Sequence, residues 1–129
     1  MILDTNVVSE IMRPAPDPRV IAWFRENAGQ QLYLTAITEA ELLYGVGLMT
    51  IKRILNMELR TPVLPFESAD ASFFAMVAVW RRQVGRPVAE LDAQIAAIAL
   101  RRGLPIATRN VRDFEDCGVT LINPWDPAP

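Results

Sequence analysis

Four acidic residues stand where short apolar segments end or where predicted helices begin. Asp4 directly follows the apolar run that opens the chain, and Asp113 lies five residues after another such run at 105–108. Glu41 and Asp92 fall in the first turns of two predicted helices. In a parallel sheet, the ends of the strands and the starts of the crossover helices share one edge. We therefore expect the four carboxylates to gather in one crevice.

Gathered carboxylates repel one another and attract divalent cations. Two carboxylates about 4 Å apart repel by about 4 kcal/mol at an effective dielectric constant of about 20, a cost that a bound cation offsets. The chain has no histidine and a single cysteine, Cys117, which excludes the usual zinc sites and the usual serine or cysteine triads. Oxygen ligands alone favour Mg²⁺ or Mn²⁺. The acids therefore predict a magnesium or manganese site.

Each of the four acids also has a purely structural explanation. Asp4 could cap the first helix, and Asp92 could complement the dipole of its own helix. Glu41 occupies the N3 position of a capping box that begins at Thr38, and residues 110–113 form another cap-like pattern. Taken singly, the capping explanation is preferred for the second and fourth acids. If all four acids served only as helix caps or dipole partners, most of the repulsion between their charges would remain without a compensating cation.

Short apolar runs rich in strand-forming residues alternate with helical patterns along the chain. Strands are predicted at 1–3, 32–35, 63–66, 105–108 and 119–123, the third of them at an edge or a strand end because it contains Pro65. Helices are predicted at 6–13, 19–27, 38–49, 51–60, 67–85 and 90–103. The alternation indicates an α/β layered sheet of four to five strands. We expect one domain over 1–129, with about 124–129 as a C-terminal tail.

Composition and hydropathy narrow the class of protein. Of the 129 residues, 51% are hydrophobic and 22% charged, which is typical of a globular domain. The longest apolar run, at 73–80, is too short to span a membrane, and the start of the chain lacks the basic region of a signal peptide. A cytoplasmic protein is expected. Because the run at 73–80 is apolar all round, we expect a helix buried by the sheet on one side and by a partner on the other.

Arginines are grouped along the chain although its net charge is −2. The pairs at 81–82 and 101–102 fall near the ends of predicted helices, where the helix dipole explains them. Arg109 and Arg112 lie beside the fourth acid. They could contact the phosphates of a substrate or form surface ion pairs.

Four segments, each containing one of the acids, follow one another along the chain. They are "LDTNVVSE" at 3–10, "AITEAELLYGV" at 36–46, "ELDAQIAAIAL" at 90–100 and "ATRNVRDFE" at 107–115, with "NPW" at 123–125 near the end. In this order they resemble the signature motifs of the PIN domain, specifically of the VapC-type toxin ribonucleases of bacterial VapBC toxin–antitoxin systems. Each motif alone is weak, but the ordered set is specific and samples nearly the whole chain.

The resemblance implies a three-layer α/β/α fold with a central, mainly parallel sheet, and Mg²⁺- or Mn²⁺-dependent cleavage of RNA with activated water. It also implies homodimerisation, a toxin that inhibits translation and growth, and inhibition by a cognate VapB-type antitoxin whose tail occupies the active-site groove. It selects Glu41 over the nearby Glu39 as a site residue. Carried over by position, it makes the metal-binding and catalytic acids Asp4, Glu41, Asp92 and Asp113, with Asn6 and Thr108 as polar support.

Two other interpretations remain, and one segment departs from the family pattern. A catalytically silent PIN-like module would act by binding alone and would not need the acids. A haloacid-dehalogenase-like phosphatase would use Asp4 as its nucleophile, but it needs a second aspartate where this chain has Asn6. The chain is shorter between Gly45 and Val63 than typical relatives, which bears on partner binding rather than on the acids.

Overall fold

The protein is built on a parallel sheet, seen in a computed structural model that describes residues 1–46 and 61–127. The strands are β1 (Ile2–Leu3), β2 (Leu34–Thr35), β3 (Val63–Leu64), β4 (Ile106–Ala107) and β5 (Leu121–Ile122). They lie in the order β3–β2–β1–β4–β5, and every pair is parallel. Two backbone hydrogen bonds of Tyr33, with Leu3 (2.9 Å) and Met1 (2.8 Å), join β2 to β1. The parallel sheet expected from the sequence is confirmed, and β3 ends before Pro65 at an edge.

Helices connect the strands. They are α1 (Thr5–Ile11), α2 (Pro18–Glu26), α3 (Ala36–Val46), α5 (Ala71–Gln83), α6 (Glu90–Arg102) and the short α7 (Val111–Phe114), with a 3₁₀ turn, η2 (Ser68–Asp70), before α5. Gly103 ends α6 in the left-handed conformation, at a φ of 65°. The helix expected over 51–60 lies outside the described residues, and α7 is not among the predicted helices. No helix in the described part of the chain is long and apolar enough to cross a membrane.

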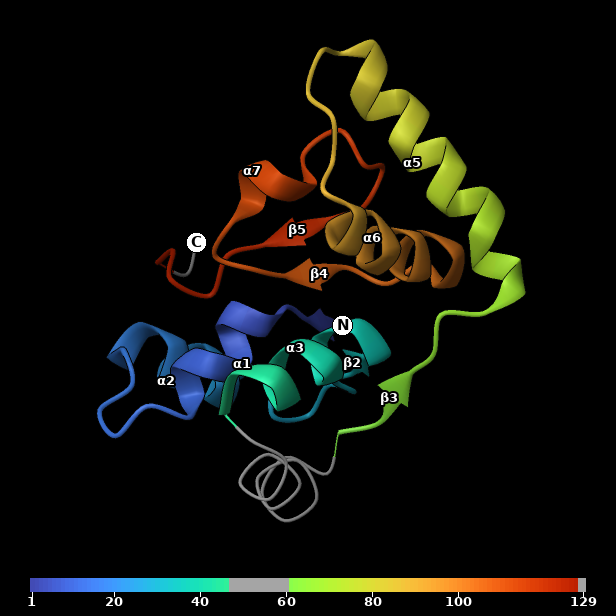
Figure 1. Cartoon of the computed structure of the whole chain (residues 1–129). Helices are drawn as coiled ribbons and strands as arrows, with labels where there is room; N and C mark the ends of the chain where they lie inside the picture. Colours follow the sequence, from blue (N-terminus) through green and yellow to red (C-terminus); the bar gives the residue numbers. More distant parts are fainter. Residues whose placement is uncertain (47–60, 128–129) are drawn as a thin grey trace.

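Residues that alternate along the strands belong to two cores, one on each face of the sheet. Ile2 and Ile106 are buried in a core with apolar side chains of α5, α6 and α7. Their neighbours Leu3 and Ala107 are buried in the other core, with side chains of α1, α2 and α3. Figure 1 shows α6 lying across β4 and β5, with α5 packed against α6. The three-layer α/β/α architecture is therefore confirmed.

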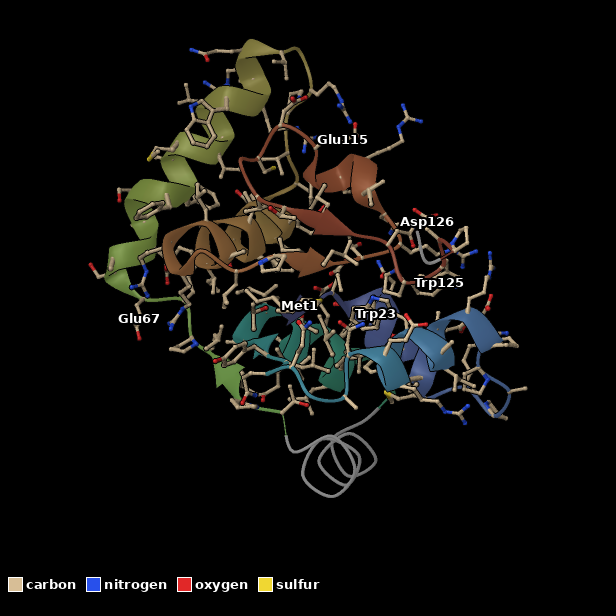
Figure 2. All side chains as sticks on the ribbon, turned by 180° about the vertical axis from the view of Figure 1, so that it is seen from behind. Met1, Trp23, Glu67, Glu115, Trp125 and Asp126 are labelled. Carbon is tan, nitrogen blue, oxygen red and sulfur yellow. The ribbon has the colours of Figure 1, made fainter. Side chains whose placement is uncertain are left out.

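The C-terminal segment that was expected to be a tail from about 124 is packed at Trp125. This side chain is only 6% exposed and belongs to the same core as Leu3. Trp23 of α2 packs against that core, and Figure 2 shows both tryptophans in this region. Burying the large apolar ring outweighs the tendency of a proline-rich end to fray. The prediction of a tail is therefore wrong at Trp125.

Helix α5 is covered on one face only. Val77 is fully buried against the core, whereas Met76 and Val79 are 41% and 49% exposed. Val77 is buried, but α5 packs mainly on α6, so the expectation that the sheet directly covers 73–80 is corrected. The opposite face of α5 is uncovered in the single chain.

Candidate functional site

Asp4 stands at the junction of β1 and α1 with its carboxylate fixed by three hydrogen bonds. Its backbone continues β1, since Asp4 N donates to the carbonyl oxygen of Ala107 (2.9 Å). Its Oδ1 accepts from the backbone N–H of Thr5 (2.8 Å), so Asp4 does cap α1. Its Oδ2 accepts from Thr108 Oγ1 (2.8 Å) and Asn6 Nδ2 (3.0 Å). A cap needs only the first of these bonds; the other two orient the second oxygen.

Asn6 and Thr108 are themselves held by backbone groups. The side-chain oxygen of Asn6 accepts from the backbone N–H of Arg109 (3.0 Å), which fixes the amide so that its nitrogen faces Asp4. The hydroxyl oxygen of Thr108 accepts from the backbone N–H of Asn110 (3.0 Å). Residues about one hundred positions apart in the chain thus share one hydrogen-bond network. Both side chains donate to Asp4, and their role as polar support of a metal site stays a prediction.

Glu41 lies in the second turn of α3, which corrects the sequence prediction. The helix begins at Ala36, and the hydroxyl of Thr35 accepts from the backbone N–H of Thr38 (3.2 Å) in the manner of a capping residue. Thr38 therefore does not start a capping box, and the structural explanation of Glu41 is wrong. Instead, Glu41 Oε1 accepts from the hydroxyl of Thr5 (3.1 Å), at the start of α1.

Asp92 lies in the first turn of α6, as expected. Its pKa is raised to about 6 by burial and by the negative charges of the other three acids, while the charge of Arg81 opposes the shift. Burial and the charge of Asp4 also raise the pKa of Glu41. These mutual effects mean that the four carboxylates lie within electrostatic range of one another. We call them, together, the acidic edge.

Asp113 lies on the exposed surface of α7, at the rim of the acidic edge. The cap-like pattern at 110–113 is not formed by its first residue, because the Asn110 side chain makes no capping hydrogen bond. Burial raises the pKa of Asp4 against the effect of its hydrogen bonds, and the charge of Asp113 adds to that rise. The carboxylate of Asp113 therefore acts on Asp4 and Asp92, although it is far less buried than they are.

The donor chemistry of the acidic edge fits a hard divalent cation. Within residues 1–46 and 61–127, no three acidic or cysteine side chains form a ready-made cage for an ion. Mg²⁺ does not require one, since it keeps several waters and usually binds through one or two carboxylates plus substrate phosphates. Burial and the neighbouring negative charges raise the pKa values of Asp4, Glu41 and Asp92, and a divalent ion would offset both effects.

Residues 1–118 match the family model of the PIN domain. The chain belongs to the PIN-domain family. It is 36% identical to the VapC ribonuclease Y4jK of Sinorhizobium fredii, over 99% of each chain. It is also 36% identical to the toxin FitB of Neisseria gonorrhoeae, over 97% of this chain and 98% of FitB. These relatives group this PIN domain with the VapC-type toxins of VapBC and FitAB toxin–antitoxin systems.

The fold agrees with that of solved PIN toxins. A chain in the crystal structure of FitAcB from Neisseria gonorrhoeae superimposes with a TM-score of 0.86 at 36% identity, over 96% of this chain and 97% of that one. The alignment with Y4jK spans 139 positions, more than the 129 residues of this PIN domain. The relative thus carries residues that this chain lacks. The shortening expected between Gly45 and Val63 falls mostly on residues that the structure does not describe.

Two arginines beside the acidic edge have no ion pair within the described part of this PIN domain. Arg109 is exposed, and its guanidinium carbon lies 5.1 Å from the centre of the Trp125 ring, in a cation–π contact. Arg112 is also exposed, and its backbone carbonyl accepts a hydrogen bond from Arg86 (2.8 Å). Surface ion pairs, one of the two explanations drawn from the sequence, are therefore not found for these side chains among the described residues.

Sequence reasoning missed Arg81. It was explained as an arginine at a helix end, but its side chain is only 5% exposed. Its Nη1 donates to the backbone carbonyl oxygen of Asp113 (2.6 Å). The available signal was its spacing, since Arg81 follows the buried Val77 by one helical turn and shares its face.

Proposed function

We propose that this PIN domain is the toxin of a type II toxin–antitoxin system and acts in the cytoplasm as a Mg²⁺-dependent ribonuclease, with Mn²⁺ able to substitute. The observation that carries the proposal is the effect of burial and of the charges of Asp4, Asp113 and Glu41 on Asp92, whose pKa they raise to about 6. Family membership supports the ribonuclease activity, and the all-oxygen donor set supports the choice of metal.

The four acids divide into a fixed and an adaptable part. Asp4 is buried and held by three hydrogen bonds, so it is the natural anchor of a cation. Glu41 flanks it from the second turn of α3 and Asp92 from the first turn of α6, and Asp113 completes the set from the rim. A divalent ion bound here supplies charge neutralisation for a scissile phosphate and makes a water more acidic. Asn6 and Thr108 keep the Asp4 carboxylate oriented toward it.

Arg109 is proposed to contact the phosphates of the RNA. Its guanidinium is exposed, carries no ion pair to a described residue, and stacks on Trp125, which limits the orientations it can take. Its backbone N–H is bonded to Asn6, so the side chain emerges directly beside the Asp4 network. Arg112 is placed less specifically, on the exposed side of α7.

The central test compares wild-type protein with Asp4→Asn in cleavage of total cellular RNA with and without Mg²⁺. We expect the variant to lose more than about 100-fold in rate, because even an outer-shell partner of a metal ligand typically accounts for 10–100-fold. It should also fail to arrest growth when expressed. Circular dichroism shows whether the fold is kept, and Glu26→Gln, which neutralises an exposed acid at the end of α2, serves as the matched control.

The alternatives give different results in the same experiment. A silent binding module would show no Mg²⁺-dependent cleavage in the wild type, and Asp4→Asn would keep the biological effect. A phosphatase would hydrolyse phosphomonoesters through an aspartyl-phosphate on Asp4 and leave RNA intact. In the structure, Asn6 occupies the position where that mechanism needs a second aspartate, and it donates to Asp4 rather than carrying a charge.

The proposal includes a cognate VapB-type antitoxin. A groove of about 600 Å³ adjoins the acidic edge, lined mainly by apolar side chains that include Tyr44, Phe66 and Leu91 beside Glu41. Tyr44 is 95% exposed there. We expect Tyr44→Asp to abolish co-purification with a co-expressed VapB-type antitoxin while RNA cleavage by the free toxin is kept. Retained co-purification would place the antitoxin elsewhere.

The proposal also includes a homodimer formed through α5. The uncovered face of this helix carries Met76 and Val79, with Val84, 52% exposed, just beyond its end. Light scattering should give twice the mass of 14.4 kDa. Val79→Lys should shift the protein to the monomer, and a monomeric wild type would contradict this part of the proposal.

A further inference from the structure

Two arginines at the end of α5 reach across to the segment that carries Asp113. Nη1 of Arg81 donates to the carbonyl oxygen of Asp113 (2.6 Å), and its Nε donates to the carbonyl oxygen of Arg86 (2.6 Å). Arg86 in turn donates through Nη2 to the carbonyl oxygen of Arg112 (2.8 Å) and through Nη1 to Glu115 (3.0 Å). Figures 1 and 2 show the connection after α5 passing beside α7, with Glu115 at this junction.

The two arginines also brace each other. The backbone N–H of Arg86 donates to the carbonyl oxygen of Arg81 (2.9 Å), which closes the chain at the end of the helix. Gly85 allows this closure because it adopts a φ of 72°. The carbonyl groups of Arg112 and Asp113 are therefore both held from one rigid turn.

Packing alone does not explain a buried guanidinium at position 81. No carboxylate forms an ion pair with it among the described residues, and a buried cation without such a partner is costly. Its contact with the sulfur of Cys117 (3.6 Å) adds no charge, since burial raises the pKa of that thiol. The charge of Arg81 does act on Asp92, whose pKa it lowers. The cation is thus compensated by hydrogen bonds and by the acidic edge.

Helix α7 needs such support because it spans only Val111–Phe114. A helix of one turn is not stable on its own, and the Asn110 side chain does not cap it. Phe114 and Cys117 are buried and anchor the segment toward the core. The arginines hold the segment in addition, through the carbonyl groups of Arg112 and Asp113.

We propose that Arg81 and Arg86 form an arginine clamp that positions Asp113 against the other three acids and thereby sets the affinity of the acidic edge for a divalent cation. This inference rests on the proposed function, in which Asp113 helps to hold the cation. The two arginines are positioning residues, which act through the backbone of α7 and touch neither the cation nor the RNA.

The first measurement is hydrogen exchange of the backbone amides at 111–117 in the metal-free protein. Arg81→Lys keeps the positive charge but loses the planar pair of donors, and Arg86→Gln loses the bonds to Arg112 and Glu115. We expect faster exchange at 111–117 in both variants and no change for Arg82→Gln, whose exposed side chain is the matched control on the same helix. Unchanged exchange in both variants would overturn the clamp. If Arg81→Lys does not fold, Arg86, whose side chain is only partly buried, still provides the test.

The second measurement is Mn²⁺ binding to RNA-free protein, followed by electron paramagnetic resonance. We expect Arg81→Lys and Arg86→Gln each to weaken binding about tenfold, the usual effect of losing an outer-shell partner of a metal site. Arg81→Met distinguishes a positioning role from a purely electrostatic one. If Arg81 acted only through its charge, removing that charge would strengthen Mn²⁺ binding, whereas loss of positioning would weaken it. Stronger binding by Arg81→Met would therefore overturn the positioning role.

A double-mutant cycle with Asp113→Asn decides whether the arginines act through this acid. In the Asp113→Asn background, we expect the arginine substitutions to weaken Mn²⁺ binding no further. Additive losses would overturn the inference while leaving the proposed function intact. Failure of the proposed function looks different, because the wild-type protein itself would then show neither Mn²⁺ binding nor Mg²⁺-dependent RNA cleavage.

Discussion

Asp4 and Asp70 both lie buried at the start of a helix, but only Asp70 has an arginine against its carboxylate. Asp70 is fully buried before α5 and accepts hydrogen bonds from Arg101 and from the backbone N–H of Glu67 (2.8 Å). Asp4 is 7% exposed and accepts only from neutral groups. An aspartate before a helix is thus paired with an arginine in one region and held only by neutral donors in the other.

The pKa values of the two regions move in opposite directions. Burial opposes ionisation of Asp70, but the bonds from Arg101 and Glu67 outweigh it and hold the pKa below its ordinary value. At the acidic edge, burial and mutual repulsion prevail, and the pKa values of Asp4, Glu41 and Asp92 are raised. Asp70, which stabilises the fold, is paired with Arg101 within the protein. The acids of the acidic edge form no ion pair among the described residues, and their proposed partner is a bound divalent cation.

The largest expected effect comes from neutralising one acid of the acidic edge, with a nearby glutamate outside this set as the control. Glu41→Gln should lower the rate of Mg²⁺-dependent RNA cleavage by at least about 100-fold, or about 2.7 kcal/mol, because the cation loses a carboxylate. Glu39→Gln on the same helix should leave the rate unchanged, since Glu39 raises the pKa of none of these acids. Equal losses in both variants, measured by the same assay, would refute the choice of Glu41.

Neutralising Asp70 should affect stability instead of cleavage. Asp70→Asn should lower the free energy of unfolding by about 2–3 kcal/mol, somewhat less than for a fully buried pair, because Arg101 keeps 24% of its side chain exposed. Urea denaturation measures the loss. Glu67→Gln is the control, since Glu67 is 51% exposed and its ion pair with Arg101 should contribute less than about 1 kcal/mol. An Asp70→Asn protein as stable as the wild type would contradict the conclusion that Asp70, unlike the acids of the acidic edge, stabilises the fold.

Asp92→Asn should do the reverse and stabilise the metal-free protein. Because the folded protein raises the pKa of Asp92 to about 6, it binds a proton more tightly than the unfolded chain, and its stability falls as pH rises from about 4 to 6. After allowance for solvent around this half-buried group, removing the charge should add about 1–2 kcal/mol at pH 8. At pH 4 the gain should vanish. Urea denaturation in a chelator tests both values.

For Asp70, the ionised carboxylate should stabilise the folded protein, whereas that of Asp92 should destabilise it. The lowered pKa of Asp70 contributes stability that is present above a pH of about 4, and that is lost as the pH falls through the folded value. The destabilisation caused by Asp70→Asn should therefore shrink under acidic conditions, because protonation of Asp70 in the wild type removes a favourable interaction. The stability gained by Asp92→Asn should also shrink there, because protonation of Asp92 in the wild type removes an unfavourable one. Identical pH profiles for the two variants would show that the regions do not differ electrostatically.

The smallest expected effect concerns the unpaired arginine at the acidic edge. Arg109→Gln should raise the KM for RNA about threefold and reduce the salt dependence of RNA binding by about one ion, as for the loss of one phosphate contact. Arg13→Gln is the control, because Arg13 is already paired with Glu10 (3.1 Å). An unchanged salt dependence would place the RNA backbone elsewhere.

Local patterns in the sequence were sufficient for the sheet and for the placing of acids at its edge, whereas the choice of Glu41 over Glu39 came from the resemblance to the PIN-domain motifs. Each strand is a short apolar run, and the parallel order of strands brings their ends to one edge whatever the details of packing. Asp4, Glu41 and Asp92 therefore lie together as expected. The same reasoning failed for the cap of α3, because Thr35 and Thr38 are equally good capping residues in isolation, and the pairing of β2 with β3 places the helix start after Thr35.

What the sequence determined by itself is the chemistry: oxygen donors without histidine, spaced so that a parallel sheet must gather them. What only the tertiary structure decided is the charge environment of each acid. Whether an aspartate is paired depends on residues such as Arg101, which binds Asp70 from a distant segment and looks like an ordinary helix-end arginine in the sequence. Charge interactions depend on distances in space and on burial, and neither is encoded in the local pattern of residues.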